Sequence, residues 1–163
     1  MKILAKKLIL PVLIIGLIGT ACDSDDSDPT DHDIMMQELE EVSAATVKYH
    51  DVQQAIADGY VDIDLFMPNM GKHFLKESLM DDKFEVDKPE LLVYTPTENG
   101  GFLLTAVEYA VPVDLSPNAP EGFTGSEDKW VINTDFNLWV LHAWIWYENP
   151  DGVFNMTNSR IVP

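Results

Sequence analysis

The stretch "ELLVYTPTENGGFLLTAVEYAVPV", residues 90–113, decides the fold of this chain. Two runs rich in leucine, β-branched and aromatic residues, 90–96 and 102–113, flank Asn99-Gly100-Gly101. Asn-Gly and Gly-Gly pairs supply the positive φ angles that tight hairpin turns require. The stretch therefore predicts two antiparallel strands joined by a hairpin.

Glu108 stands out within the second run. Successive residues of a strand point to opposite faces, so Glu108 is expected on the same face as Leu104, Ala106 and Ala110. A carboxylate among apolar neighbours needs a charged or hydrogen-bonding partner. His142 and His73 are the two candidates for that partner.

His142 lies in "FNLWVLHAWIWYENPDG", residues 136–152. Both alternating faces of 138–147 are apolar, which predicts a central strand covered on both sides. A type I turn at 149–152 is expected to return 153–156 antiparallel to this strand. On this alternation Trp144 and Trp146 share a face with His142. A buried imidazole is costly when charged, so His142 should be neutral and hydrogen-bonded, or a metal ligand.

The remaining elements predict an α+β domain, residues 34–163, with one N-terminal amphipathic helix packed on a mainly antiparallel sheet. Apolar residues spaced by three and four favour a helix over 34–58, with Asp33 and Gly59 as caps. Alternation predicts strands at 60–66 and 129–134, whereas 72–88 has no assignment. Residues 114–129 have no periodicity and form a candidate binding loop or lid.

Three hypotheses account for the histidines. In the first, His73, Glu108 and His142 converge on zinc, iron or copper, which imidazole and carboxylate ligands suit. A variant of it uses Met67, Met70 and His73 for Cu(I), because thioethers favour that ion.

In the second hypothesis, Trp144 and Trp146 line a groove that binds a small apolar or sugar ligand, since aromatic faces offer a large contact area. In the third, His142 and Glu108 only satisfy each other inside the core. The chain carries no GxSxG, no phosphate-binding glycine-rich loop and no CxxC. No motif therefore supports catalysis.

The first 21 residues are typical of an export signal peptide. Three lysines precede an apolar run, residues 8–21, which is shorter than the ~20 residues of a membrane-spanning helix. The run ends at Thr20-Ala21-Cys22, which resembles the lipobox of bacterial lipoproteins. That resemblance implies that Cys22 is acylated, with palmitate or a similar chain, and anchors the protein to a membrane.

Residues 22–33 are expected to form an acidic tether, because like charges repel and no apolar face is present. An acidic run after a lipidated cysteine resembles the surface-export signal of lipoproteins in some Gram-negative bacteria. It implies a surface-exposed protein anchored to the outer membrane. Without the leader, seven basic residues stand against 28 acidic ones, a net charge of −21. Such a charge excludes nucleic acid as a partner.

Four stretches together resemble a family of small exported bacterial proteins of uncharacterised activity. They are "ADGYV" (57–61), "MPNMGKHF" (67–74), "PELLVYTP…VEYAVP" (89–112) and "LHAWIWYENPDGVFNMTN" (141–158). The shared patterns are MG-x-H, PE-x-L-x-Y, EY-x-VP and H-x-W-x-W-x-x-NP-x-G-x-F. They contain His73, Glu108 and His142, so the resemblance implies a role for these residues.

The sequence as a whole predicts an envelope lipoprotein with a site for a metal or small ligand. The alternative is a structural or interaction module of the envelope with no such site.

Overall fold

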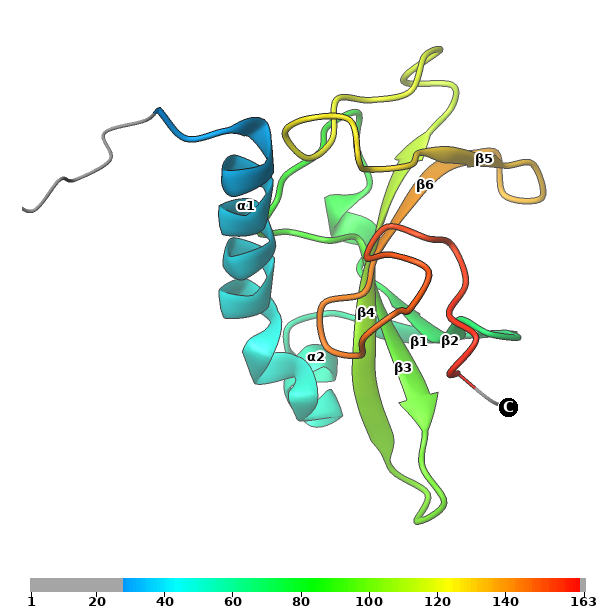
Figure 1. Cartoon of the computed structure of the whole chain (residues 1–163). Helices are drawn as coiled ribbons and strands as arrows, with labels where there is room; N and C mark the ends of the chain where they lie inside the picture. Colours follow the sequence, from blue (N-terminus) through cyan, green and yellow to red (C-terminus); the bar gives the residue numbers. More distant parts are fainter. Residues whose placement is uncertain (1–27, 162–163) are drawn as a thin grey trace, which may run out of the picture.

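The hairpin of residues 90–113 forms the centre of a six-stranded antiparallel sheet (Figure 1). The computed structural model describes residues 28–161, so the predicted signal peptide and Cys22 lie outside the described residues. The strand order is β1-β2-β3-β4-β6-β5. The strands are β1 (Val61–Met67), β2 (Gly71–Leu75), β3 (Leu91–Pro96), β4 (Phe102–Pro112), β5 (Val131–Asn133) and β6 (Leu138–Ala143). The prediction of a single α+β domain is confirmed.

The helical segment differs from the prediction of one N-terminal amphipathic helix over 34–58. It begins at Asp31, after 30 residues of chain, and it is divided into α1 (Asp31–Thr46), a 3-10 turn η1 (Val47–His50) and α2 (Val52–Ala57). Asp51 divides it, because its backbone is extended and its carboxylate accepts a hydrogen bond from the Gln53 N–H, which caps α2. The first cap is Thr30, in a capping box with Asp33. Residues 31–33, which the sequence assigned to the tether, therefore belong to α1.

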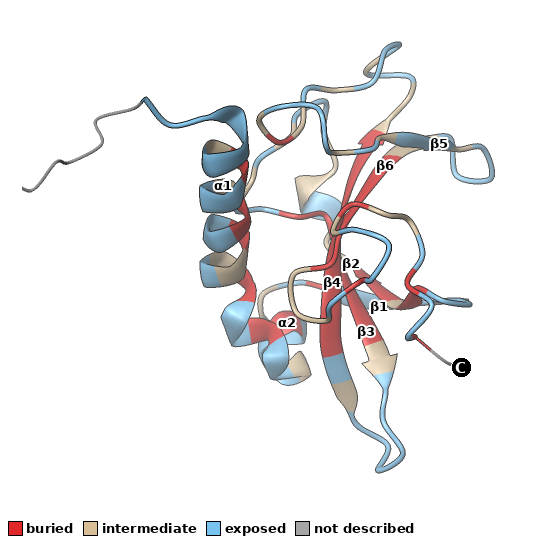
Figure 2. Ribbon diagram, viewed as in Figure 1, coloured by how far each residue is buried: buried red, intermediate tan, exposed pale blue. Residues whose placement is uncertain are grey.

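The main core lies between these helices and one face of the sheet (Figure 2). Met35, Leu39 and Val42 of α1 pack in one cluster with side chains of β3, β4 and β6. Three buried tyrosines of the cluster, Tyr60, Tyr94 and Tyr109, donate their hydroxyls to backbone carbonyls, whereas Tyr49 donates to the Asp58 carboxylate. The buried hydrophobic residues of the described part run from Met35 to Ile161, all within the segment 23–163.

The predicted hairpin is confirmed, but its second strand contains a β-bulge. Val93 and Tyr94 of β3 pair with Ala106 and Leu104 of β4, which leaves Thr105 as the extra residue. Leu104 therefore packs in the helix-side core, and the prediction that it shares a face with Glu108 is wrong. The bulge reverses the alternation between Leu104 and the residues that follow.

Strand β6 ends at Ala143, four residues earlier than predicted, because of the same bulge. The Thr105 carbonyl accepts hydrogen bonds from the backbone N–H groups of Trp146 and Tyr147, at 3.2 and 3.1 Å, in place of a regular ladder. Residues 153–156 form no strand, although the Trp144 N–H donates to the Val153 carbonyl. Residues 114–129 have no helix or strand, as predicted.

Within residues 28–161, no helix has the length and apolar character that crossing a membrane requires.

Candidate metal centre

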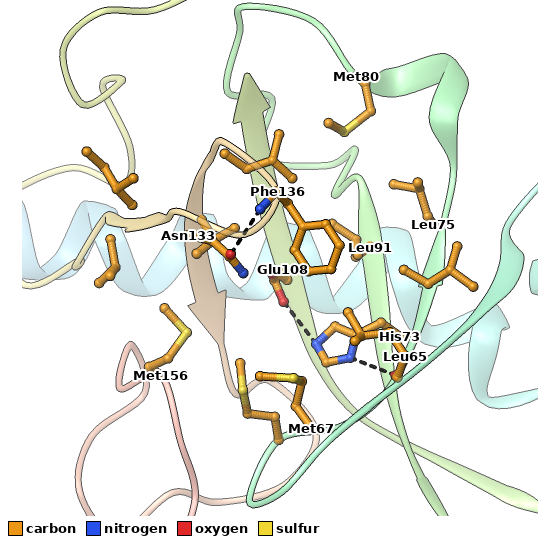
Figure 3. A pocket seen from close by; sticks show the side chains of 16 residues that line it. Leu65, Met67, His73, Leu75, Met80, Leu91, Glu108, Asn133, Phe136 and Met156 are labelled. Atoms are coloured by element: carbon orange, nitrogen blue, oxygen red, sulfur yellow. Dashed lines mark hydrogen bonds and ion pairs between the residues drawn. The ribbon is translucent and has the colours of Figure 1, made fainter. Parts of the chain in front are cut away.

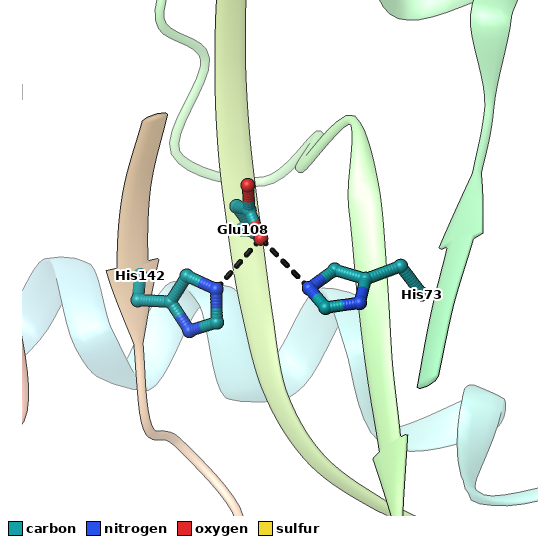
Figure 4. Close-up of side chains that lie close together, drawn as sticks. All are labelled: His73, Glu108 and His142. Atoms are coloured by element: carbon teal, nitrogen blue, oxygen red, sulfur yellow. Dashed lines mark hydrogen bonds and ion pairs between the residues drawn. The ribbon is translucent and has the colours of Figure 1, made fainter. Parts of the chain in front are cut away.

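Strands β2, β4 and β6 bring His73, Glu108 and His142 to one place on the face opposite the helices. Glu108 of β4 pairs directly with His142 of β6. His73 of β2 pairs with Val93 of β3 and reaches Glu108 across that strand. The three side chains are distant in sequence, and the structure brings them together as the sequence analysis predicted (Figure 4).

Both imidazoles contact the same oxygen of the Glu108 carboxylate. His142 Nε2 lies 2.6 Å from Glu108 Oε2, and His73 Nε2 lies 3.1 Å from it. The exposed fractions are 0% for His142, 1% for His73 and 6% for Glu108. This is a buried cluster in which solvent screens the charges little.

The cluster contains an ion pair. Burial alone would raise the pKa of the Glu108 carboxyl, but the two histidines outweigh burial and hold that pKa at about 2. Burial lowers the pKa of His73, yet the hydrogen bond and charge of Glu108 leave it raised. His73 Nδ1 also lies 3.3 Å from the Leu65 carbonyl, so both ring nitrogens face acceptors. Together with the raised pKa, this arrangement favours the imidazolium form of His73 beside the Glu108 carboxylate.

The remaining ring nitrogen of the cluster, His142 Nδ1, is buried and has no hydrogen-bond partner among the described residues. Packing, rather than a second hydrogen bond, orients this ring. The Trp144 ring lies beside it, with the two centroids 5.6 Å apart.

The same three atoms can hold a metal ion. His73, Glu108 and His142 can each offer one ligand atom, and these atoms lie within 4.8 Å of one another. Two imidazoles and a carboxylate are a ligand set of zinc and of non-haem iron, with metal–ligand distances of ~2.0–2.2 Å. A metal would displace the Nε2 protons, while the His73 Nδ1–H would still donate to Leu65. The Leu65 carbonyl would then fix the orientation of the His73 ring, as outer partners of metal-binding histidines do.

A cavity of about 400 Å³ opens over His73 and Glu108 (Figure 3). Of the sixteen residues that line it, three have polar side chains: His73, Glu108 and Asn133. His142 is fully buried and does not line the cavity. A ligand in the cavity would therefore meet the cluster from the side of Glu108 and His73.

The predicted tryptophan face is divided between the two sides of the sheet. Trp144 packs with Val93 and Ala106 beside His142, whereas Trp146 packs on the helix-side core and donates from Nε1 to Thr46 Oγ1. Neither lines the cavity. The prediction that Trp144 and Trp146 share a face is wrong, because β6 ends at Ala143 and the strand alternation does not continue to Trp146. Their role in ligand binding stays a prediction.

The methionines of the Cu(I) variant, Met67 and Met70, both line the cavity together with His73.

Sequence reasoning missed two polar side chains. Glu90 is 3% exposed, and its carboxylate accepts a hydrogen bond from the Ala110 N–H at 3.0 Å. Burial, assisted by Asp81 and Glu85 and opposed by the backbone hydrogen bonds, raises the pKa of Glu90 to about 8. Asn133 lies in an edge strand and enters the cavity wall. One sequence signal could have identified Glu90 as buried. Glu90 directly precedes the apolar run of β3.

Comparison of the chain with protein-family models, with curated proteins and with solved structures gives no match.

Proposed function

We propose that this protein is a lipid-anchored lipoprotein, exposed on the outer membrane, whose domain binds a transition metal through His73, Glu108 and His142. One observation carries the proposal of a metal: three buried potential ligand atoms within 4.8 Å of one another. The lipid anchor and the location rest on the sequence around Cys22.

Zinc is the metal that the ligand set favours first. Imidazole nitrogen suits zinc, copper and iron, whereas calcium and magnesium prefer sites made of oxygen ligands. Three protein ligands leave one position open, which is the arrangement of zinc sites that receive water or another small ligand. In this chain the open position would face the cavity, because Glu108 and His73 line it.

The competing function is a structural or interaction module without a metal. One observation favours it: the ion pair of Glu108 and His73, together with His142, already satisfies the buried charge. The two functions therefore differ in whether a metal ion can displace the protons of the cluster and bind in their place.

The test uses residues 23–163, freed of metal by a chelator and then incubated separately with zinc, copper and iron. After desalting, mass spectrometry measures the metal that each sample retains. We expect about one zinc ion per chain, and a loss of most of it in His73→Ala and His142→Ala.

The chain offers matched controls, His32→Ala and His50→Ala, since both histidines are exposed and lie outside the cluster. These variants should retain the metal. The proposal fails when no metal stays bound near one per chain, or when the two cluster variants retain as much as the two controls.

A further inference from the structure

The cavity over the cluster is larger than a metal centre requires. Residues of both edge strands, Ile63 of β1 and Ile132 of β5, line it together with residues of the central strands. The sheet therefore curves around the cavity. A volume of about 400 Å³ falls within the ~300–1,000 Å³ of small-molecule sites.

The rim of the cavity is made of exposed apolar side chains. Exposed fractions of 36% to 54% belong to five of its lining residues: Ile63, Met67, Val131, Ile132 and Phe136. Leaving several large apolar side chains in water around one hollow is unfavourable, and such patches mark sites where a ligand binds. The rim therefore favours an aliphatic or aromatic body in the ligand.

The floor of the cavity offers one unused acceptor. Both histidines contact Glu108 Oε2, and within the described residues no hydrogen bond reaches Oε1. The Oε1 atom is not fully enclosed by the protein, and Glu108 lines the cavity. Oε1 therefore faces the cavity as an acceptor that a ligand can use.

Four methionines in the lining allow the wall to adapt to a ligand. They are Met67, Met70, Met80 and Met156. Methionine is unbranched and polarisable, and it fits irregular apolar shapes at low cost. This property suits a flexible hydrocarbon chain better than a rigid polar molecule.

We propose that the cavity binds a medium-chain aliphatic molecule whose head group, a hydroxyl or an ammonium, donates a hydrogen bond to Glu108 Oε1. The aliphatic body lies against the methionines and the apolar rim. A carboxylate head is disfavoured, because it brings only acceptors to an acceptor and because the chain carries a net charge of −18. The inference does not rest on the metal, since its acceptor is the oxygen that the histidines leave free.

Three ligands with the same ten-carbon body test the head group: decanol, decylamine and decanoate. Calorimetric titrations use residues 23–163 in a chelator, below the micelle concentration of each ligand. We expect decanol and decylamine to bind at least tenfold more tightly than decanoate. Glu108→Gln should weaken decylamine at least tenfold and abolish the discrimination against decanoate.

An exposed rim residue provides a second variant for the case that Glu108→Gln does not fold. Phe136 is 54% exposed and lines the cavity, whereas Leu115 is 56% exposed and does not line it. Phe136→Ala should weaken decanol and decylamine about fivefold, and Leu115→Ala should leave both affinities unchanged.

The inference is overturned by absence of binding for decanol and decylamine, or by equal affinities for the three head groups. It is also overturned when Phe136→Ala and Leu115→Ala have the same effect. Binding that appears only after zinc is added would likewise overturn it, because the head group would then bind the metal. Failure of the metal proposal leaves these expected results unchanged.

Discussion

Two buried glutamates of this domain have opposite charge states. Histidines hold the pKa of Glu108 at about 2, whereas burial, with Asp81 and Glu85 nearby, raises that of Glu90 to about 8. At neutral pH Glu108 is therefore a carboxylate and Glu90 a neutral acid. The difference follows from the charged side chains beside each carboxyl, which are histidines at Glu108 and acidic residues at Glu90.

Substitution of Glu90 by glutamine should reveal this difference. A carboxyl with a higher pKa in the folded chain than in the unfolded one binds its proton more tightly when folded. The Glu90 contribution to the free energy of unfolding therefore falls as pH rises from the ordinary value of 4.5 to about 8. The loss is up to ~1.4 kcal/mol per pH unit. Urea unfolding of both proteins across this range should show Glu90→Gln gaining stability relative to the unsubstituted chain.

Glu108→Gln is the matched comparison, and its effect should have the opposite sign. Removing one partner of a buried ion pair costs about 3–5 kcal/mol at pH 7. Because the pKa of Glu108 is lowered, its contribution is present above 4.5 and is lost as pH falls toward about 2. A Glu90→Gln protein with the same pH dependence as the unsubstituted chain would contradict the assignment of Glu90 as a neutral acid.

At the scale of elements, the sequence predicts those parts of the fold whose pattern is local. The β3–β4 hairpin follows from Asn99-Gly100-Gly101 and its flanking runs. Strand β2 was missed because it has five residues, of which Lys72 and His73 are polar. Lys72 is polar for a local reason, since it forms ion pairs with Asp62 and Asp64 of β1.

The candidate site was also predictable where its sequence pattern is local. A histidine and a glutamate among apolar neighbours identify His142 and Glu108 as residues that need partners. The cavity over Glu108 depends on the curvature of the sheet, which lets side chains of both edge strands, β1 and β5, line it. That arrangement comes from contacts between distant segments and leaves no local pattern. The Thr105 bulge is likewise invisible to simple alternation.

Gly71 makes the turn into β2 possible and positions His73, two residues later. Its φ is +126°, and a Cβ there would lie 2.6 Å from the Tyr94 carbonyl oxygen of β3. Gly71→Ala therefore combines backbone strain with a collision against a neighbouring strand. We expect the free energy of unfolding to fall by about 2–5 kcal/mol in urea titrations.

Gly100→Ala separates these two causes. Gly100 has a φ of +75°, but a Cβ there would meet no atom within 4 Å. Only the left-handed backbone is then penalised, at about 1–2 kcal/mol. Equal losses in the two variants would show that the contact between Gly71 and Tyr94 does not constrain the sheet.

At the scale of the whole molecule, the net charge and the proposed lipid anchor act in opposite directions. Residues 22–163 carry seven basic against 28 acidic side chains, so this part of the chain is strongly anionic. Anionic lipid headgroups repel such a chain. Attachment to a membrane therefore requires a favourable term large enough to exceed this repulsion. Acyl chains on Cys22 would supply it, at ~0.8 kcal/mol for each buried CH₂ group, and more than one chain is needed for stable attachment.

Cys22→Ala should consequently release the protein from membranes. We expect the substituted protein to incorporate no labelled palmitate and to leave the membrane fraction after an alkaline wash, because no acyl chain then offsets the repulsion. Ser24→Ala, a substitution of similar size two residues later, should remain labelled and bound. Fractionation of cells that express each form measures both outcomes. A Cys22→Ala protein that stays in the washed membranes would mean that the apolar leader, residues 8–21, is retained and provides the attachment itself.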